Sequence, residues 1–310
     1  MVEERTPVLE VEHLSVSFRM YHSALEQHYL KVISDLNIRV CEGEIVAIAG
    51  SSGSGKSLLA HAVMGLLPEN SVTEGEIRYR GELLDETRQA SLRGREMALV
   101  PQSVSFLDPL MKVRQQVQGA GRKKMEAQKD IFHRLGLEDG VNKLYPFQLS
   151  GGMARRVLVS TAVISDADLI IADEPTPGMD AALAREALNC FRELADSGKA
   201  VLLITHDIDI ALEVADRIGV FYGGTTLELA DAADFHGKGE DLRHPYSRAL
   251  WNALPQNGFA PIPGFQPYAG EITQGCLFAP RCGKAAKECR TGTIPMRRIR
   301  DGEVRCLYAT

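Results

Sequence analysis

Eight consecutive residues near the start of the chain have the types and the spacing needed to bind phosphate. They fit the pattern G-x-x-x-x-G-K-[S/T] at every position, after an apolar run at 44–49 and before a helical run at 58–64. Glycines let backbone N–H groups curl around phosphate oxygens, and the N-terminus of the next helix adds its positive end. The lysine supplies a positive charge toward the outer phosphates, and the final serine hydroxyl can bind Mg²⁺. The residues are Gly50, Ser51, Ser52, Gly53, Ser54, Gly55, Lys56 and Ser57.

A second turn rich in glycine argues against the alternative, an accidental glycine-rich loop. Residues 149–153 read Leu-Ser-Gly-Gly-Met and open a helical run, so Ser150, Gly151 and Gly152 offer backbone donors for another anion. One nucleotide cannot use both turns of one subunit. The two motifs together therefore imply a partner subunit.

Two adjacent acids come directly after the apolar run 169–172. Asp173 can hold Mg²⁺ through water, opposite Ser57. Glu174 points the other way if the strand continues, and we expect it to polarise the water that attacks the phosphate. A solvated strand end is the alternative for this pair.

Five motifs in this order resemble those of the ATP-binding subunits of ABC transporters, over nearly the whole chain. Besides the phosphate loop and residues 149–153, they are Val-Pro-Gln at 100–102, Asp-Leu-Ile-Ile-Ala-Asp-Glu at 168–174 and Thr-His-Asp at 205–207. The resemblance implies that Gln102 reaches the metal or the water, and that His206 contacts the γ-phosphate. It also implies that Lys56, Mg²⁺ and the 150–152 turn of a partner surround that phosphate, so ATP hydrolysis requires two subunits to close.

Two segments depart from the usual pattern of these subunits. Met153 stands where many relatives have glutamine; methionine is common at this position in the branch that imports peptides and nickel. In the segment Pro-Thr-Pro-Gly-Met-Asp at 175–180, Asp180 is kept, but Pro177 and Gly178 alter the loop at the subunit interface, because proline fixes φ and removes a donor. The departure therefore bears on coupling between two nucleotide sites more than on hydrolysis.

The strands near the N-terminus must position the nucleotide base. Residues 8–18 alternate in the manner of a half-buried strand, and residues 30–49 hold two more strand candidates. In the resembling family such antiparallel strands flank the base. We favour Tyr29 over Tyr21 and Phe18 as the aromatic residue that stacks on it; packing within the protein is the alternative for each.

The remaining pattern predicts an α/β fold. The short apolar runs 169–172 and 201–205 are typical of parallel strands covered on both faces, and residues 105–165 are mostly helical by pattern. The resemblance implies a P-loop NTPase core of the ABC type, with an antiparallel β subdomain, a helical subdomain at about 105–165 and a cysteine-containing C-terminal extension. We expect the nucleotide-binding domain to span residues 1–235 and the extension residues 236–310.

The extension holds four of the six cysteines in a segment rich in proline and glycine. Their spacing is C-x5-C-x6-C-x16-C, without the paired C-x2-C of zinc knuckles, and soft thiolates favour zinc or an iron–sulfur cluster. The four are Cys276, Cys282, Cys289 and Cys306. Some members of the resembling family carry a [4Fe–4S] cluster on such cysteines; zinc, free thiols or a disulfide are the alternatives. Residues 244–250 (His-Pro-Tyr-Ser-Arg-Ala-Leu) also resemble a stretch peculiar to the oligopeptide, dipeptide and nickel importer ATPases.

Composition and charge narrow the class of protein. The 310 residues are 45% hydrophobic and carry a formal net charge of −6, so a core can form and no nucleic-acid partner is indicated. No apolar run approaches the ~18 residues of a membrane span, and the acidic N-terminus has no signal-peptide core. We therefore expect a peripheral protein at the cytoplasmic face of the cell membrane.

The function implied by the resemblance is ATP hydrolysis that powers import of peptides, or of a related solute such as nickel. The expected partners are a paralogous ABC ATPase subunit, two membrane permeases and an extracytoplasmic solute-binding protein, and the expected cofactors are ATP and Mg²⁺. The alternative is a non-transport ABC ATPase. Two features speak against it. Repair ATPases need a long heptad arm, whereas no heptads run between Ser57 and Leu149, and translation-type members carry two cassettes, whereas this sequence holds one.

Overall fold

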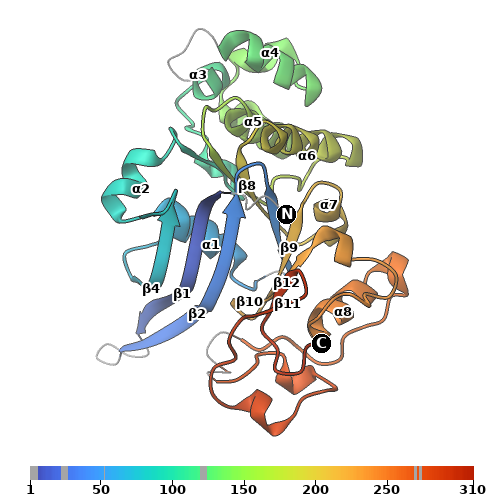
Figure 1. The fold of residues 1–310 in the computed structure, drawn as a ribbon. Helices are drawn as coiled ribbons and strands as arrows, with labels where there is room; N and C mark the ends of the chain where they lie inside the picture. Colours follow the sequence, from blue (N-terminus) through green and yellow to red (C-terminus); the bar gives the residue numbers. More distant parts are fainter. Residues whose placement is uncertain (1–5, 22–26, 52, 119–123, 269–270, 272–273) are drawn as a thin grey trace.

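The computed structural model describes residues 6–21, 27–51, 53–118, 124–268, 271 and 274–310, and its strands form two sheets (Figure 1). The strands of the larger sheet are β3 (Ile45–Gly50), β6 (Met97–Val100), β7 (Leu169–Asp173), β8 (Ala200–Thr205), β9 (Arg217–Tyr222), β10 (Thr225–Asp231), β11 (Arg297–Ile299) and β12 (Gly302–Val304). Their spatial order is β11-β12-β10-β9-β3-β8-β7-β6. The smaller sheet has the order β2-β1-β4-β5, from β1 (Pro7–Tyr21), β2 (Gln27–Cys41), β4 (Ser71–Tyr79) and β5 (Glu82–Leu83).

The centre of the larger sheet is parallel and buried on both faces. β3 pairs in parallel with β8 and β9, and β7 pairs in parallel with β6 and β8. Every residue of β3, β7 and β8 is buried. The continuous apolar runs of these strands follow from this double burial, as the sequence predicted.

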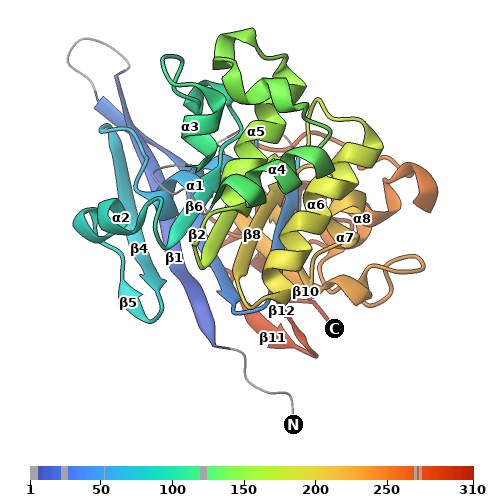
Figure 2. The same cartoon turned by 90° about the horizontal axis from the view of Figure 1, so that it is seen from above.

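Alternate residues of β3 contribute to two hydrophobic cores, because successive side chains of a strand point to opposite faces. Ile45, Ala47 and Ala49 lie in a core shared with α5 (Gly151–Val163) and α6 (Ala181–Asp196). Val46 and Ile48 lie in a second core, with α1 (Lys56–Met64) and the strands of the smaller sheet. Figure 2 shows α5 and α6 on the side of the large sheet away from β1 and β4.

A group of helices lies beyond α5 (Figure 1). The group contains α3 (Val113–Gln118) and α4 (Lys124–Arg134), both packed on α5, in the region predicted to be the helical subdomain. The other α-helices of the described residues are α2 (Glu86–Leu92), α7 (Ile208–Leu212) and α8 (Pro245–Asn252).

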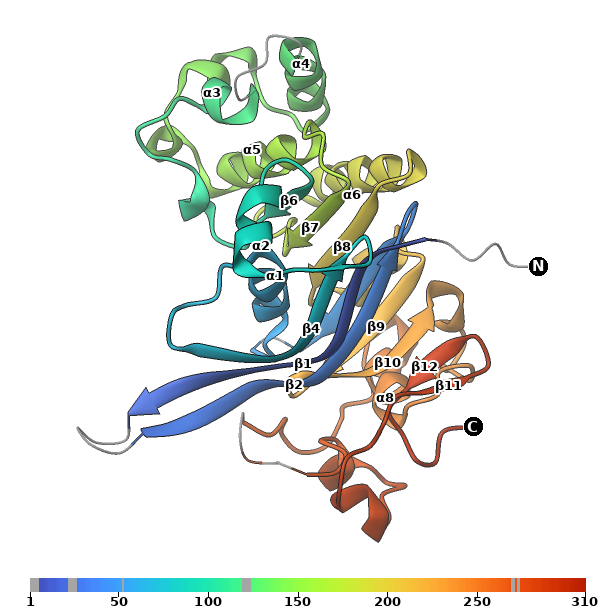
Figure 3. The same cartoon turned by 60° about the vertical axis from the view of Figure 1, so that its left-hand side comes forward.

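The long hairpin of β1 and β2 extends away from the rest of the molecule (Figure 3). Its antiparallel pairing continues from Leu9 opposite Val40 to Tyr21 opposite Gln27. The two aromatic candidates Tyr21 and Tyr29 are exposed on it, at 64% and 62%.

The C-terminal extension is built onto the larger sheet. β12 pairs with β10, which is itself antiparallel to β9, and β11 pairs with β12, so the chain after residue 236 adds two antiparallel strands outside β10. The same eight-stranded sheet therefore carries both the strand that precedes the phosphate loop and the end of the extension.

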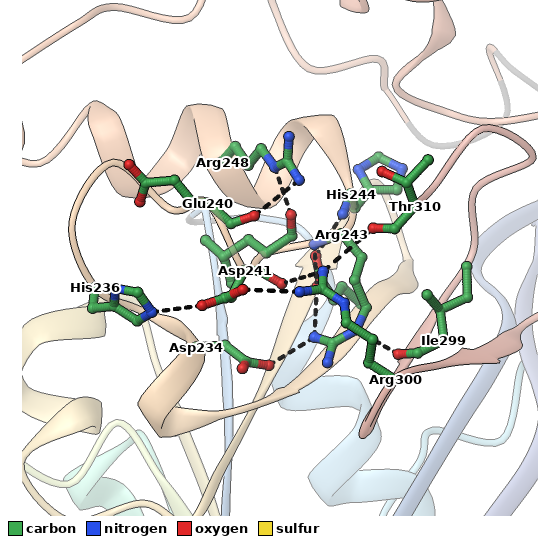
Figure 4. A network of polar contacts seen from close by, with 12 residues as sticks. Asp234, His236, Glu240, Asp241, Arg243, His244, Arg248, Ile299, Arg300 and Thr310 are labelled. Atoms are coloured by element: carbon green, nitrogen blue, oxygen red, sulfur yellow. Dashed lines mark hydrogen bonds and ion pairs between the residues drawn. The ribbon is translucent and has the colours of Figure 1, made fainter.

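A buried ion pair between Arg243 and Glu228, at 3.4 Å, joins the extension to β10. Glu228 is fully buried, and its carboxylate accepts hydrogen bonds from the backbone N–H groups of Arg243 (2.7 Å) and His244 (2.8 Å). The Arg243 guanidinium contacts Asp234 at 2.7 Å and the Ile299 carbonyl oxygen at 2.7 Å (Figure 4). Buried charges are tolerated when they are paired and hydrogen-bonded in this way, so the network fixes the start of α8 and the β11–β12 hairpin.

Candidate functional site

The phosphate-binding loop leaves β3 at Gly50 and enters α1 at Lys56, the predicted strand–loop–helix arrangement. A side chain on Gly50 would place its Cβ 2.3 Å from the carbonyl oxygen of Phe221 on β9, so only glycine fits. Gly53 and Gly55 have φ values of 75° and 93°, which other residues rarely adopt. Ser52 lies outside the described residues.

Lys56 lies folded over this loop. Its ammonium donates to the carbonyl oxygens of Gly50 (2.8 Å) and Ser51 (2.9 Å), and the residue is only 6% exposed. Burial lowers the pKa of Lys56, while the carboxylates of Asp173 and Glu174 oppose that shift. The amine is thus placed where a bound phosphate would compensate its buried charge.

Three side chains with oxygen atoms that could bind a metal lie beside the loop: Ser57, Gln102 and Asp173. Asp173 ends β7 at 1% exposure; burial raises its pKa and a hydrogen bond with Ser57 lowers it. One buried carboxylate oxygen of Asp173 has no hydrogen-bond partner among the described residues. Ser57 Oγ lies 3.5 Å from the side-chain oxygen of Gln102. Hydroxyl, carboxylate and amide oxygens are the ligands that Mg²⁺ takes, so these residues fit the metal.

Glu174 and His206 contact each other directly. His206 follows β8, and its Nδ1 lies 2.8 and 2.9 Å from the two carboxylate oxygens of Glu174. Glu174 is 7% exposed and has a φ of +48°, a conformation uncommon for a residue with a side chain. Its backbone N–H donates to the Ile204 carbonyl oxygen at 2.9 Å, which holds this turn against β8. Such strain is found at functional sites.

The glycine turn at 150–152 begins α5. The Ser150 hydroxyl caps the helix by accepting a hydrogen bond from the backbone N–H of Met153 at 3.2 Å. A Cβ on Gly152 would lie 2.6 Å from the carbonyl oxygen of Gly178, which has a φ of +81°. The unusual Pro-Gly segment therefore packs against the anion-binding turn of its own chain; Gly152 is needed for this close approach, and Gly178 is favoured by its positive φ.

β2 passes over the phosphate loop, since a Cβ on Gly55 would lie 3.4 Å from a side-chain carbon of Val32. Tyr29 is on the same strand, opposite Arg19 of β1. Phe18 packs against the second core instead. The exposed ring of Tyr29 stays the predicted stacking residue.

Residues 33–177 match the family model described as ABC transporter, and residues 227–289 match that of the oligopeptide/dipeptide transporter C-terminal region. The dipeptide transport ATP-binding protein DppD of Escherichia coli (strain K12) is 34% identical, over 97% of this chain and 96% of that protein. This chain belongs to the ATP-binding subunits of ABC transporters. The match to the C-terminal region confirms the predicted oligopeptide/dipeptide branch.

Two further comparisons bear on this ABC subunit. The oligopeptide transport ATP-binding protein OppD of Mycobacterium tuberculosis is 34% identical over 92% of this chain, which spans 49% of that longer relative. Among solved structures, the dimeric bacterial ABC transporter cassette MJ0796 aligns with a TM-score of 0.63 and 25% identity, over 72% of this chain and 98% of that one. The predicted fold class is therefore confirmed.

Arg155 is a candidate functional residue that the sequence did not reveal, because two arginines after the glycine turn resemble an exposed helix face. It is 9% exposed, and its guanidinium donates to the Pro101 carbonyl oxygen at 2.8 Å. Burial lowers the pKa of Arg155, while Asp173 and Glu174 oppose that shift. Arg155 thus ties the helix of the anion-binding turn to the residue before Gln102, and its charge faces the two acids.

Replacing Arg155 with methionine is expected to raise the Mg²⁺ concentration for half-maximal ATP hydrolysis ~3–10-fold, the effect of losing about one hydrogen bond that positions Gln102. A Mg²⁺ titration of ATPase activity measures it. Arg192→Met is the control, because Arg192 also bonds a carbonyl oxygen, that of Val214 at 3.1 Å, away from the loop. Equal Mg²⁺ midpoints for both variants would contradict the prediction.

The four C-terminal cysteines of the ABC subunit come together in space. A cavity of about 20 Å³ is lined by all four and by His244; the cysteines are Cys276, Cys282, Cys289 and Cys306. All four are free thiols, and burial raises the pKa of Cys276 to about 11. His244 Nε2 lies 3.9 Å from the Cys276 sulfur, and burial lowers the pKa of His244 to about 3. Within the described ranges, no group of three or more potential ligands is close enough to hold a metal ion.

Proposed function

We propose that this chain is the ATP-hydrolysing subunit of a membrane importer for peptides. The observation that carries the proposal is the convergence at the phosphate loop of Lys56, the oxygen donors around Asp173, and the Glu174–His206 pair. The membership in the oligopeptide/dipeptide branch supports the transport role over DNA repair or translation.

The side chains divide the work of phosphoryl transfer. Lys56 neutralises charge on the outer phosphates, and Ser57, Asp173 and Gln102 would hold Mg²⁺, which neutralises further charge on the phosphate oxygens. Glu174 accepts a hydrogen bond from the attacking water and orients it. His206 donates to Glu174 through Nδ1 in the observed contact, so the imidazole fixes the direction of the carboxylate.

A second ABC subunit completes the site in this proposal. The 150–152 turn lies at the start of α5, in the helical part of the molecule. The phosphate loop instead leads into α1, which lies between the two sheets (Figure 1). We infer a heterodimer with a paralogous ATPase, two permease subunits and an extracytoplasmic solute-binding protein, at the cytoplasmic face of the membrane. In the part of the chain that the structure describes, no helix is long and apolar enough to cross a bilayer, which agrees with separate permeases.

The test is to compare the purified chain with the assembled importer. We expect slow ATP hydrolysis by the dilute chain alone and much faster hydrolysis with permeases and loaded binding protein. Vesicles that contain the importer should take up labelled di- or oligopeptides and not ⁶³Ni²⁺. Uptake of nickel would show that the solute is not a peptide, and uptake of neither would overturn the import function. Full permease-independent activity of a monomer would contradict the shared site.

We further propose that the four C-terminal cysteines hold a [4Fe–4S] cluster. The support is one cavity lined by all four thiols, because sulfur donors suit iron and binding would deprotonate them. Since no three of the described ligands are close enough to hold a metal ion, the thiols would have to draw together when the cluster binds. Such a cluster would brace a segment that has few buried apolar side chains, and its role would be structural or redox-sensing.

Anaerobic purification tests the cluster. We expect brown protein with about four iron and four sulfide per chain, the content of a four-cysteine cubane. Cys282→Ser should remove the colour, whereas Cys190→Ser, at a lone buried cysteine, should keep it. One zinc per chain, or colourless protein with four titratable thiols, would reject the cluster.

A further inference from the structure

The C-terminal extension reaches the phosphate loop. The Ser51 hydroxyl donates to the side-chain oxygen of Gln266, and the Tyr246 phenol of α8 lies close enough to Ser51 for this serine to oppose the rise in its pKa. A serine hydroxyl has one donor and two acceptor sites, so it can serve both partners at once. Neither Gln266 nor Tyr246 belongs to any motif of the nucleotide site, and both lie in the region after residue 236.

The segment that carries Gln266 is itself held in place. Arg281 donates to the carbonyl oxygens of Pro263 (2.7 Å) and Ile262 (2.9 Å), and to the hydroxyl of Tyr222 at 3.2 Å. Arg281 therefore joins the stretch before Gln266 to the end of β9. β9 lies beside Gly50 in the sheet and so supports the phosphate loop. The stretch before Gln266 is therefore held in place by the same strand that supports the loop.

Tyr246 is fixed by aromatic packing. Its ring lies 4.5 Å from that of Tyr222 and 5.2 Å from that of Phe278, and Phe278 lies 5.6 Å from Tyr222. All three residues are buried. Burial raises the pKa of Tyr246 to about 12, so its hydroxyl stays protonated and able to donate. The contact with Ser51 thus comes from a rigid block of the extension.

Ser51 in turn contacts the lysine of the loop, because its carbonyl oxygen accepts a hydrogen bond from Lys56 Nζ at 2.9 Å. A change in the position of Ser51 moves this acceptor and alters where the ammonium lies. We propose that Gln266 and Tyr246 are positioning residues for the nucleotide: the extension holds Ser51, and through it Lys56, in the arrangement that receives the phosphates. This inference rests on the proposed function, since it assigns how the same ATP site is supported.

The experiment measures ATP affinity by calorimetry and KM and kcat of the assembled importer. Gln266→Ala and Tyr246→Phe are each expected to weaken ATP affinity and raise KM ~3–10-fold, with kcat within twofold of the parent, because only binding geometry is disturbed. Asn257→Ala is the matched control; its amide also lies in the extension but donates to the Trp251 carbonyl oxygen at 3.1 Å. We expect the control to keep the parent ATP affinity.

A double-mutant cycle separates positioning from general loss of structure. Ser51→Ala alone and Ser51→Ala combined with Gln266→Ala should give the same ATP affinity, because the first change already removes the shared hydrogen bond. Additive losses, or unchanged affinity in Gln266→Ala and Tyr246→Phe with normal melting temperatures, would overturn the inference. If the parent chain itself failed to bind ATP, the proposed function would fall instead.

Discussion

Glu174→Gln is expected to lower ATP turnover by ~10²–10⁴-fold, the usual contribution of a positioned general base, while ATP binding is kept. The amide is nearly isosteric but no longer a good proton acceptor. The structure adds a reason for the size of the effect, because Glu174 is buried and its carboxylate is aligned by His206 at 2.8 Å. Phosphate release by the assembled importer measures turnover, and calorimetry measures binding.

Glu213→Gln is the matched control for this variant. Its carboxylate is exposed and pairs with Arg185 at 3.2 Å, away from the phosphate loop, so its turnover should equal that of the parent. Turnover of Glu174→Gln within twofold of the parent would remove Glu174 from the role of orienting the attacking water. Accumulation of a closed, ATP-bound dimer would support that role.

Lys56→Ala is expected to weaken ATP affinity ~10–100-fold and to lower the rate as well, because charge-assisted hydrogen bonds to the phosphates stabilise the ground state and the transition state alike. The variant also removes the buried positive charge that faces Asp173 and Glu174. Calorimetry with ATP, followed by phosphate release at saturating ATP, separates the two effects.

Lys199→Ala tests whether loss of any lysine bonded to backbone carbonyl oxygens would do the same; Lys199 is half-buried. Lys199 also donates to two carbonyl oxygens, those of Ser165 (3.1 Å) and Ala167 (2.6 Å), but away from the loop. We expect a lower melting temperature and unchanged ATP affinity. Unchanged affinity in Lys56→Ala would mean that the loop does not bind phosphate.

Some contacts of the site could be predicted only in part. The sequence placed Glu174 and His206 each after a buried strand, and β7 and β8 are neighbours in the sheet, so their meeting follows from the parallel order. The strand order also explains why Asp173 lies near Ser57. The direct contact between Glu174 and His206 depends on the positive φ of Glu174, which no sequence pattern signalled.

The four cysteines are a second part of the molecule that the sequence predicted only in part. Their crowding near the C-terminus predicted a shared role, and the structure brings all four to one cavity. His244 also lines it, because the Glu228 carboxylate fixes the start of α8 beside the cysteines. The histidine was noted in sequence only as part of a resemblance.

The sequence by itself determined the family, the phosphate loop and the order of the catalytic motifs, because each is written in a few contiguous residues whose chemistry depends on local backbone geometry. Only the tertiary structure decided that Arg155 bonds Pro101, 54 residues away, and that Ser51 bonds Gln266, 215 residues away. Such pairs depend on how helices pack on the sheet and on the addition of β11 and β12 beside β10. Packing of this kind is set by many weak contacts spread along the chain, so no short stretch of sequence encodes it.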